Sequence, residues 1–330
     1  MRGTVTDAVR PGGPGAGGAC GAGGAGGAAD RRDPPGARDR MVAELAGPLG
    51  SRQEAVWIVE HAGVEGAPAL ARRRLTGEPL QYVLGRWPFR SVELQVDPRV
   101  LIPRPETEQV VEVALGELAR SVRYPGTVDP DPDAATTASP SGDLTPRVVV
   151  DLGTGSGAMA LALAVEGPGV GADPSIWATD ASDDALEVAR ANRETLGRTD
   201  GRAAERVHLV PGSWFDALPV ELAGRVDLVV SNPPYVTESE YPHLDPTVRL
   251  WEPRAALVAP ADGAGVAGMA DIAAIVAGAP RWLAPGGALV VEIAPSLARP
   301  AVEAARVAGF TRVSTPRDLA GRIRMLVAGR

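Results

Sequence analysis

Short apolar runs alternate with helix-like segments along the second half of the chain. The apolar runs cover residues 148–152, 176–179, 207–210, 226–230 and 288–293, and segments such as 158–165 and 183–196 have helical spacing between them. Such alternation is typical of βαβ units, and uninterrupted apolar runs are typical of strands buried on both faces of a parallel sheet. Two further runs, 310–315 and 323–328, would close the sheet edge. The pattern predicts an α/β, Rossmann-like domain over residues 147–330.

The N-terminal half has a different pattern, with apolar residues at helical spacing over residues 42–49 and 55–62. A weaker helical candidate follows over residues 70–75 and carries an arginine run, Arg72 to Arg74. These segments predict a small helical domain over residues 39–90. We interpret the arginine run as a solvated helix face rather than as a contact for an acidic partner.

Between these domains, residues 92–101 are typical of extended chain and residues 106–118 of a helix, so we expect a linker over residues 91–120. Two other segments are poor in large apolar residues. Residues 1–38 are rich in glycine and alanine, and residues 121–146 are rich in proline, aspartate, serine and threonine. Such segments cannot offset the entropy of ordering by burying apolar surface, so they predict a disordered tail and a flexible insertion.

Composition and charge narrow the classes of function. The chain has 330 residues, of which 45% are hydrophobic, and its formal net charge is -8 with no lysine. This acidic balance argues against a dedicated nucleic-acid binder. The single cysteine, Cys20, rules out an internal disulfide and a cysteine-cluster metal site, and no apolar run is long enough to span a membrane. We therefore expect a cytoplasmic protein without a metal or a membrane contact.

The first chemical motif is Asp-Leu-Gly-Thr-Gly-Ser-Gly at residues 151–157, where the first predicted strand turns into a helix. Glycine allows positive φ and a close approach of the backbone to a ligand, so the motif indicates a nucleotide-like cofactor. Asp180, at the end of the second strand, can accept hydrogen bonds from ribose hydroxyls. A dinucleotide site, a plain turn and, for Asp180, a helix cap are the alternatives. The candidate cofactor-binding residues are Asp151, Gly153, Thr154, Gly155, Gly157 and Asp180.

The second motif is Asn232-Pro233-Pro234-Tyr235, which follows the fourth strand. Proline fixes φ and restricts the residue before it, so this backbone is rigid. The Asn232 side-chain oxygen and the Pro233 carbonyl can accept the two hydrogens of an NH2 group, and Tyr235 can stack on a planar acceptor. An amide nitrogen is a weak nucleophile, so positioning and carbonyl dipoles must promote its attack on a sulfonium methyl group. The motif therefore indicates methyl transfer to a planar amide or amino nitrogen.

Together these motifs resemble the HemK/PrmC family of protein-(glutamine-N5) methyltransferases, which modify the glutamine of the Gly-Gly-Gln loop in bacterial peptide chain release factors. The resemblance runs from about residue 75 to the C-terminus. Besides the two motifs above, it includes Gly-Glu-Pro-Leu-Gln-Tyr at 77–82, Leu-Ile-Pro-Arg-Pro-Glu-Thr-Glu at 101–108 and Glu-Pro at 252–253.

This resemblance implies a class I methyltransferase sheet of seven strands with one antiparallel strand, S-adenosyl-L-methionine as the cofactor and a release factor as the protein partner. It also implies that Ser213 and Trp214 flank the adenine and that Asn232 and Pro233 bind the glutamine amide, with Asn232 also close to the cofactor. Arg104 and Glu106 are candidates either for the entrance to the site or for an interdomain ion pair, and Glu292 ends the fifth strand at the same sheet edge.

Two departures keep other substrates open. The helical domain that docks the release factor in this family has only residues 41–77 available here, so a paralogue acting on another protein, such as a ribosomal protein, is an alternative. Ile323 precedes Arg324 where the family leads us to expect an acidic residue, and nothing in the sequence explains that change. An adenine-N6 or cytosine-N4 methyltransferase would share the motif at 232–235 but would need a basic groove or target-recognition element. A nicotinamide oxidoreductase or a cofactor-binding scaffold leaves that motif unexplained.

Overall fold

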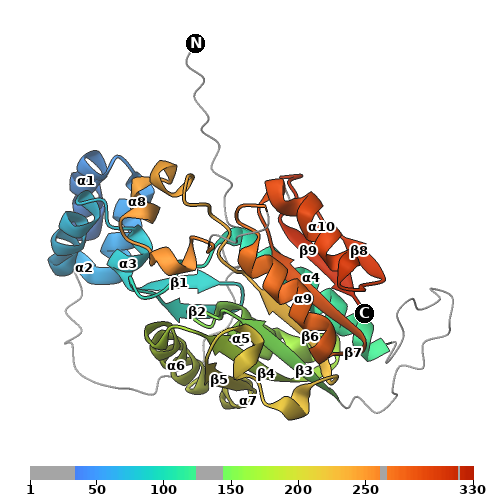
Figure 1. Ribbon diagram of the computed structural model, residues 1–330. Helices are drawn as coiled ribbons and strands as arrows, with labels where there is room; N and C mark the ends of the chain where they lie inside the picture. The colour runs from blue at the N-terminus through green and yellow to red at the C-terminus, as the bar shows by residue number, and fades with distance from the viewer. Residues whose placement is uncertain (1–33, 124–143, 261–265, 319) are drawn as a thin grey trace.

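A seven-stranded sheet forms the centre of the computed structural model (Figure 1), which describes residues 34–123, 144–260, 266–318 and 320–330. The sheet order is β5-β4-β3-β6-β7-β9-β8, and β9 runs antiparallel to both of its neighbours while the remaining pairs are parallel. The expected sheet with one antiparallel strand is therefore confirmed. Its strands are β3 (Thr145–Leu152), β4 (Ala172–Asp180), β5 (Val207–Pro211), β6 (Val226–Ser231), β7 (Leu283–Glu292), β8 (Arg312–Ser314) and β9 (Met325–Gly329).

Helices cover both faces of this sheet, which explains why apolar residues predominate in its central strands. Val149 of β3 packs in the core on one face, and its neighbour Val150 packs in the core on the other. The first face is covered by α4 (Pro105–Arg123), α5 (Ala158–Glu166), α6 (Asp183–Gly197) and α7 (Gly201–Glu205). The second is covered by α9 (Ala270–Trp282) and α10 (Ala298–Val307).

The N-terminal part is mainly helical and has its own small core around Ile58 and Val59. The predicted helices at 55–62 and 70–75 are one element, α2, interrupted at Gly63, which has φ 66 and ψ 179. A hairpin follows, of which only the second strand lies within the segment 92–101 that the sequence predicts to be extended. Phe89 and Leu94 carry the hairpin into the core of the main sheet. The elements are α1 (Ala37–Leu49), α2 (Arg52–Leu75), α3 (Leu80–Leu84), β1 (Arg86–Phe89) and β2 (Val92–Gln95).

The arginine run in α2 is only in part a solvated face. The Arg73 guanidinium donates to both oxygens of Glu78, at 2.9 and 2.5 Å, and the Arg74 guanidinium donates to Glu54 at 2.8 and 3.2 Å. Two of the three arginines therefore hold carboxylates of the same domain, which links the end of α2 to its beginning and to the segment before α3.

Short elements complete the chain: η1 (Gly167–Val170), η2 (Trp214–Ala217), η3 (Val220–Leu222), η4 (Tyr241–His243), α8 (Pro246–Arg249), η5 (Arg254–Ala256) and η6 (Pro295–Leu297). Residues 1–33 of the predicted tail and 124–143 of the predicted insertion lie outside the described residues. Among the residues that are described, no helix is both long and apolar enough to cross a membrane, and no group of histidine, cysteine, aspartate or glutamate side chains could hold a metal ion.

Candidate active site

The two sequence motifs meet at one edge of the sheet because their strands end in register. Leu152 of β3 pairs with Thr179 of β4 on one side and with Ser231 of β6 on the other. The residues that follow therefore emerge side by side, around a pocket of about 510 Å³, a volume typical of small-molecule sites. Eight of the predicted site residues line it: Gly153, Thr154, Gly155, Asp180, Ser213, Trp214, Asn232 and Pro234. The others, Asp151, Gly157, Pro233, Tyr235, Arg104 and Glu106, do not line its wall.

The glycine loop brings backbone close to an aromatic ring. Gly153 and Gly155 have φ of 71° and 56°, in the left-handed region that favours glycine. The backbone N–H groups of Gly153 and Thr154 both donate to the Thr179 carbonyl at 2.9 Å, which holds the start of the loop against β4. A Cβ on residue 153 would lie 3.1 Å from the Trp214 ring, so the tryptophan is packed directly on this backbone.

Asp180 organises the loop from the neighbouring strand. One of its carboxylate oxygens accepts the Gly155 N–H at 2.8 Å, and the other accepts the Ser182 N–H at 2.9 Å. Burial raises the pKa of Asp180, while these backbone hydrogen bonds act to lower it. The helix-cap alternative does not hold, because the Ser182 side chain caps α6 by accepting the Ala185 N–H.

Asp151 lies beneath the loop rather than on the pocket wall. It is fully buried, and one of its oxygens accepts the Thr154 hydroxyl at 2.7 Å and the Ala160 N–H at 3.1 Å. Burial raises the pKa of Asp151 to about 7. Its contacts fix the loop to the start of α5, which is a supporting position rather than a contact with the pocket.

Trp214, which packs on the glycine loop, is held in an uncommon backbone conformation. Its φ is 44°, and its carbonyl accepts the Thr179 hydroxyl at 3.2 Å. Asp271, in the first turn of α9, also lines the pocket, and burial raises the pKa of its carboxyl group. Asp271 was missed from the sequence because it belongs to a helix with no motif of its own.

The Asn-Pro-Pro-Tyr segment is anchored at both ends. The Ser231 hydroxyl donates to the Leu152 carbonyl at 2.8 Å, and beyond the motif the Val236 N–H donates to the Leu257 carbonyl at 2.9 Å. Burial raises the pKa of Tyr235 to about 12, so its phenol stays neutral. The Asn232 side-chain NH2 lies 3.3 Å from the Thr107 hydroxyl.

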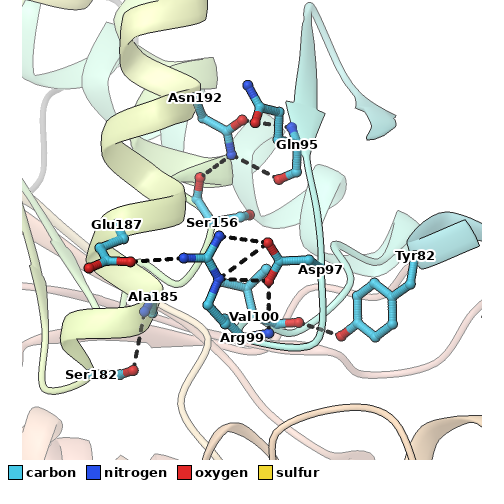
Figure 2. Close-up of polar contacts among 10 residues, drawn as sticks. All are labelled: Tyr82, Gln95, Asp97, Arg99, Val100, Ser156, Ser182, Ala185, Glu187 and Asn192. Atoms are coloured by element: carbon cyan, nitrogen blue, oxygen red, sulfur yellow. Dashed lines mark hydrogen bonds and ion pairs between the residues drawn. The ribbon is translucent and has the colours of Figure 1, made fainter. Parts of the chain in front are cut away.

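The linker between the domains forms another wall of the pocket, through Arg99, Val100, Leu101 and Pro103. Figure 2 shows how it is held. The Gln95 N–H donates to the Asn192 side-chain oxygen at 2.6 Å, and the Asn192 NH2 donates to the carbonyls of Gln95 at 3.0 Å and Ser156 at 2.9 Å. Asn192 therefore joins the linker, α6 and the glycine loop.

Two further contacts in Figure 2 fix the next stretch of the linker. Arg99 donates to Asp97 and, at 2.9 Å, to Glu187 of α6. The Tyr82 hydroxyl of α3 donates to the Val100 carbonyl at 2.5 Å. The linker is thus attached to the helical domain and to the sheet domain at once.

Arg104 and Glu106 take part in ion pairs, which is one of the two alternatives for them. Arg104 pairs with the buried carboxylate of Glu252, which also accepts the Ile102 N–H at 3.1 Å. Glu106 lies 3.7 Å from Arg322 and 3.6 Å from Arg324. These pairs surround the acceptor segment without lining the pocket.

Comparison with known proteins shows which family this chain belongs to. A family model described as "Methyltransferase small domain" matches residues 138–245. A release factor glutamine methyltransferase of Gloeobacter violaceus is 39% identical over 88% of this chain and 85% of its own, and one of Bordetella pertussis is 38% identical over 87% and 92%. This chain belongs to the release factor glutamine methyltransferase family. A solved methyltransferase from Pyrococcus furiosus is 20% identical over 68% of this chain and 98% of its own, with a TM-score of 0.39.

Membership of the release factor glutamine methyltransferase family confirms the resemblance drawn from the motifs and sets aside the nicotinamide oxidoreductase. In this family member, the structure shows where four further residues lie, of which only Asp271 belongs to no segment named from the sequence. Thr107 and Asp271 line the pocket, while Glu252 and Glu292 lie buried behind its wall. Thr107 lies inside a family motif, so the sequence could have indicated it as a site residue. The sequence could not have indicated that Glu292 is its hydrogen-bond partner.

Proposed function

We propose that this chain transfers a methyl group from S-adenosyl-L-methionine to the side-chain amide nitrogen of the glutamine in the Gly-Gly-Gln loop of a peptide chain release factor. The observation that supports this most directly is the meeting of Asn232 with the glycine loop and Asp180 on one pocket. A loop that would bind a nucleoside and a side chain that would accept NH2 hydrogens thus line the same pocket. Such a substrate would put the reaction in the cytoplasm, with a protein as partner.

The pocket suits a nucleoside with a charged tail. The Asp180 carboxylate would accept ribose hydroxyls, Ser213 and Trp214 would flank the adenine, and the backbone of residues 153–155 would approach the rest of the molecule. When bound, S-adenosyl-L-methionine supplies an electrophilic methyl group. A Cβ on residue 153 would lie 3.1 Å from the Trp214 ring, so glycine at this position lets the tryptophan that would flank the adenine lie close against the loop.

The acceptor segment would orient the glutamine amide. The Asn232 side-chain oxygen and the Pro233 carbonyl would accept its two hydrogens, so that the nitrogen lone pair is directed at the methyl group. Their dipoles would also stabilise the positive charge that develops on the nitrogen. Tyr235 would offer a neutral ring to the planar amide, since its raised pKa of about 12 keeps a negative charge away. The methylated nitrogen would then lose its proton to water.

Transfer of a radioactive methyl group tests this function. The wild-type enzyme should label a purified release factor, and the same factor with glutamate in place of the Gly-Gly-Gln glutamine should stay unlabelled because it has no NH2 group. Asn232→Ala should lower turnover by about 100-fold while leaving the affinity for S-adenosyl-L-methionine nearly unchanged. Ribosomal proteins and duplex DNA serve as alternative acceptors, and labelling of either one in place of the release factor would overturn the proposal.

A further inference from the structure

A buried chain of hydrogen bonds runs behind the acceptor asparagine. The Thr107 hydroxyl, in the first turn of α4, donates to the Glu292 carboxylate at the end of β7 at 2.7 Å. The Asn232 NH2 group, just after β6, donates to the same Thr107 oxygen at 3.3 Å. Thr107 is 5% exposed and Glu292 is 3% exposed. Three residues far apart in the sequence thus meet below the reaction site.

The chemistry of these groups dictates the direction of each bond. An ionised carboxylate only accepts hydrogen bonds, and a threonine hydroxyl has one hydrogen to give. Because that hydrogen points to Glu292, the Thr107 oxygen can only accept from its second partner. Asn232 must therefore present its NH2 group to Thr107, which leaves its oxygen as the end of the amide that is free to accept from a substrate.

We infer that Thr107 and Glu292 are positioning residues that set the orientation of the Asn232 amide, an inference that rests on the proposed function. Without them the side-chain amide could rotate by half a turn and present its NH2 group to the glutamine NH2 group. Two sets of donors would then face each other, and the hydrogen bond that orients the substrate would be lost. Thr107 acts through Asn232 and is not itself required to touch the reacting atoms.

The burial of Glu292 supports this role. A carboxylate that is nearly inaccessible to water destabilises the fold unless its interactions compensate, so an apolar residue would serve a purely structural position better. Burial raises the pKa of Glu292 to about 7, and the charged groups around it are Glu106, Arg324 and Arg104. At pH 8 the carboxyl group is mainly ionised and acts as the acceptor that the chain of hydrogen bonds needs.

A double-mutant cycle at pH 8 tests the inference. Thr107→Val removes the hydroxyl at nearly constant volume, and Thr107→Ala gives the same test if the valine variant does not fold. Either variant should lower kcat for methylation of the release factor by about 10- to 100-fold, with the affinity for S-adenosyl-L-methionine unchanged by calorimetry. Thr107→Ser keeps the hydroxyl and should restore most of the lost kcat. Thr199→Val, which removes an exposed hydroxyl bound to the Leu196 carbonyl at 3.0 Å just after α6, is the control and should keep the wild-type rate.

The decisive comparison is with Asn232→Ala. If Thr107 acts through Asn232, the Thr107→Val, Asn232→Ala double variant should be no slower than Asn232→Ala alone in single-turnover labelling. A double variant slowed by the full product of the two single effects, or a Thr107→Val enzyme with wild-type kcat, would overturn the inference. A wild-type enzyme that methylates a different amino nitrogen would instead overturn the proposed function, and the same cycle on that acceptor would still decide the role of Thr107.

Discussion

Gly268 is a point at which a small change outside the pocket should slow the reaction. It has φ +86°, and a Cβ built on it would lie 2.5 Å from the backbone oxygen of Tyr235 in the acceptor segment. The closest comfortable C···O separation is about 3.3 Å, so Gly268→Ala must displace one of the two backbones by about 0.8 Å. Displacements of about 1 Å at a reacting centre can reduce rates by about 100-fold. We therefore expect kcat to fall by about 10- to 100-fold, with the affinity for S-adenosyl-L-methionine unchanged.

Gly309→Ala is the matched control for this substitution. Gly309 has φ +89°, and a Cβ built on it would meet no atom within 4 Å beyond its own chain neighbours. Both alanine variants bear the same left-handed backbone strain of about 1–2 kcal/mol, and Gly268→Ala should lose more stability in chemical denaturation because it also displaces a backbone. Only Gly268→Ala should lose activity in steady-state methylation of the release factor. Equal activity in the two variants would show that the contact with Tyr235 does not hold the acceptor segment in place.

Three other substitutions or truncations follow from the contacts described above. Asp180→Ala should weaken S-adenosyl-L-methionine binding by about 1–3 kcal/mol in calorimetry, and Asp180→Asn should weaken it less because one acceptor oxygen remains; unchanged affinity in the alanine variant would remove the ribose assignment. Burial raises the pKa of the Glu292 carboxyl group from 4.5 to about 7, so the folded wild-type protein loses stability as the pH rises from 4.5 to 8. Glutamine does not ionise. The free energy of unfolding of Glu292→Gln, relative to that of wild type, should therefore rise by about 3 kcal/mol over this pH range. A parallel pH dependence of the two proteins in denaturant melts would contradict this. A chain that begins at Met41 lacks the first turn of α1, including buried Ala37, and should melt below one that begins at Pro34, with equal methylation rates for both; equal melting temperatures would show that this turn adds no stability.

The sheet could be predicted from the sequence because its strands are buried on both faces. Such burial favours strands in which apolar residues predominate, and the two motifs stand where two such strands end, at residues 152 and 231. Parallel strands end at the same edge, so the meeting of Gly153 with Asn232 follows from strand order alone. The hairpin β1–β2 could be predicted only in part, as extended chain from residue 92, because its first strand has only four residues and contains Pro88.

The polar framework behind the pocket could not be predicted for a different reason. Thr107 and Glu292 are 185 residues apart, and Ile102 and Glu252 are 150 apart. Local periodicity carries no information about such pairs, which depend on how α4 packs across the sheet. For the same reason, Arg104 could be named as a candidate from its motif, while its partner Glu252 became visible only in the folded chain.

The position of the Asn232 side-chain oxygen thus depends on contacts between elements that are far apart in the sequence. The linker is bound to the helical domain through Tyr82, to α6 and the glycine loop through Asn192, and to the acceptor asparagine through Thr107. A methyl acceptor as weakly nucleophilic as an amide needs positioning of this kind, because its lone pair is delocalised into the carbonyl group. Since the same linker joins the helical domain to Asn232, the residues that would dock a protein substrate and those that would orient its glutamine belong to one connected framework. Changes at the junction of the domains should therefore affect turnover as well as substrate affinity.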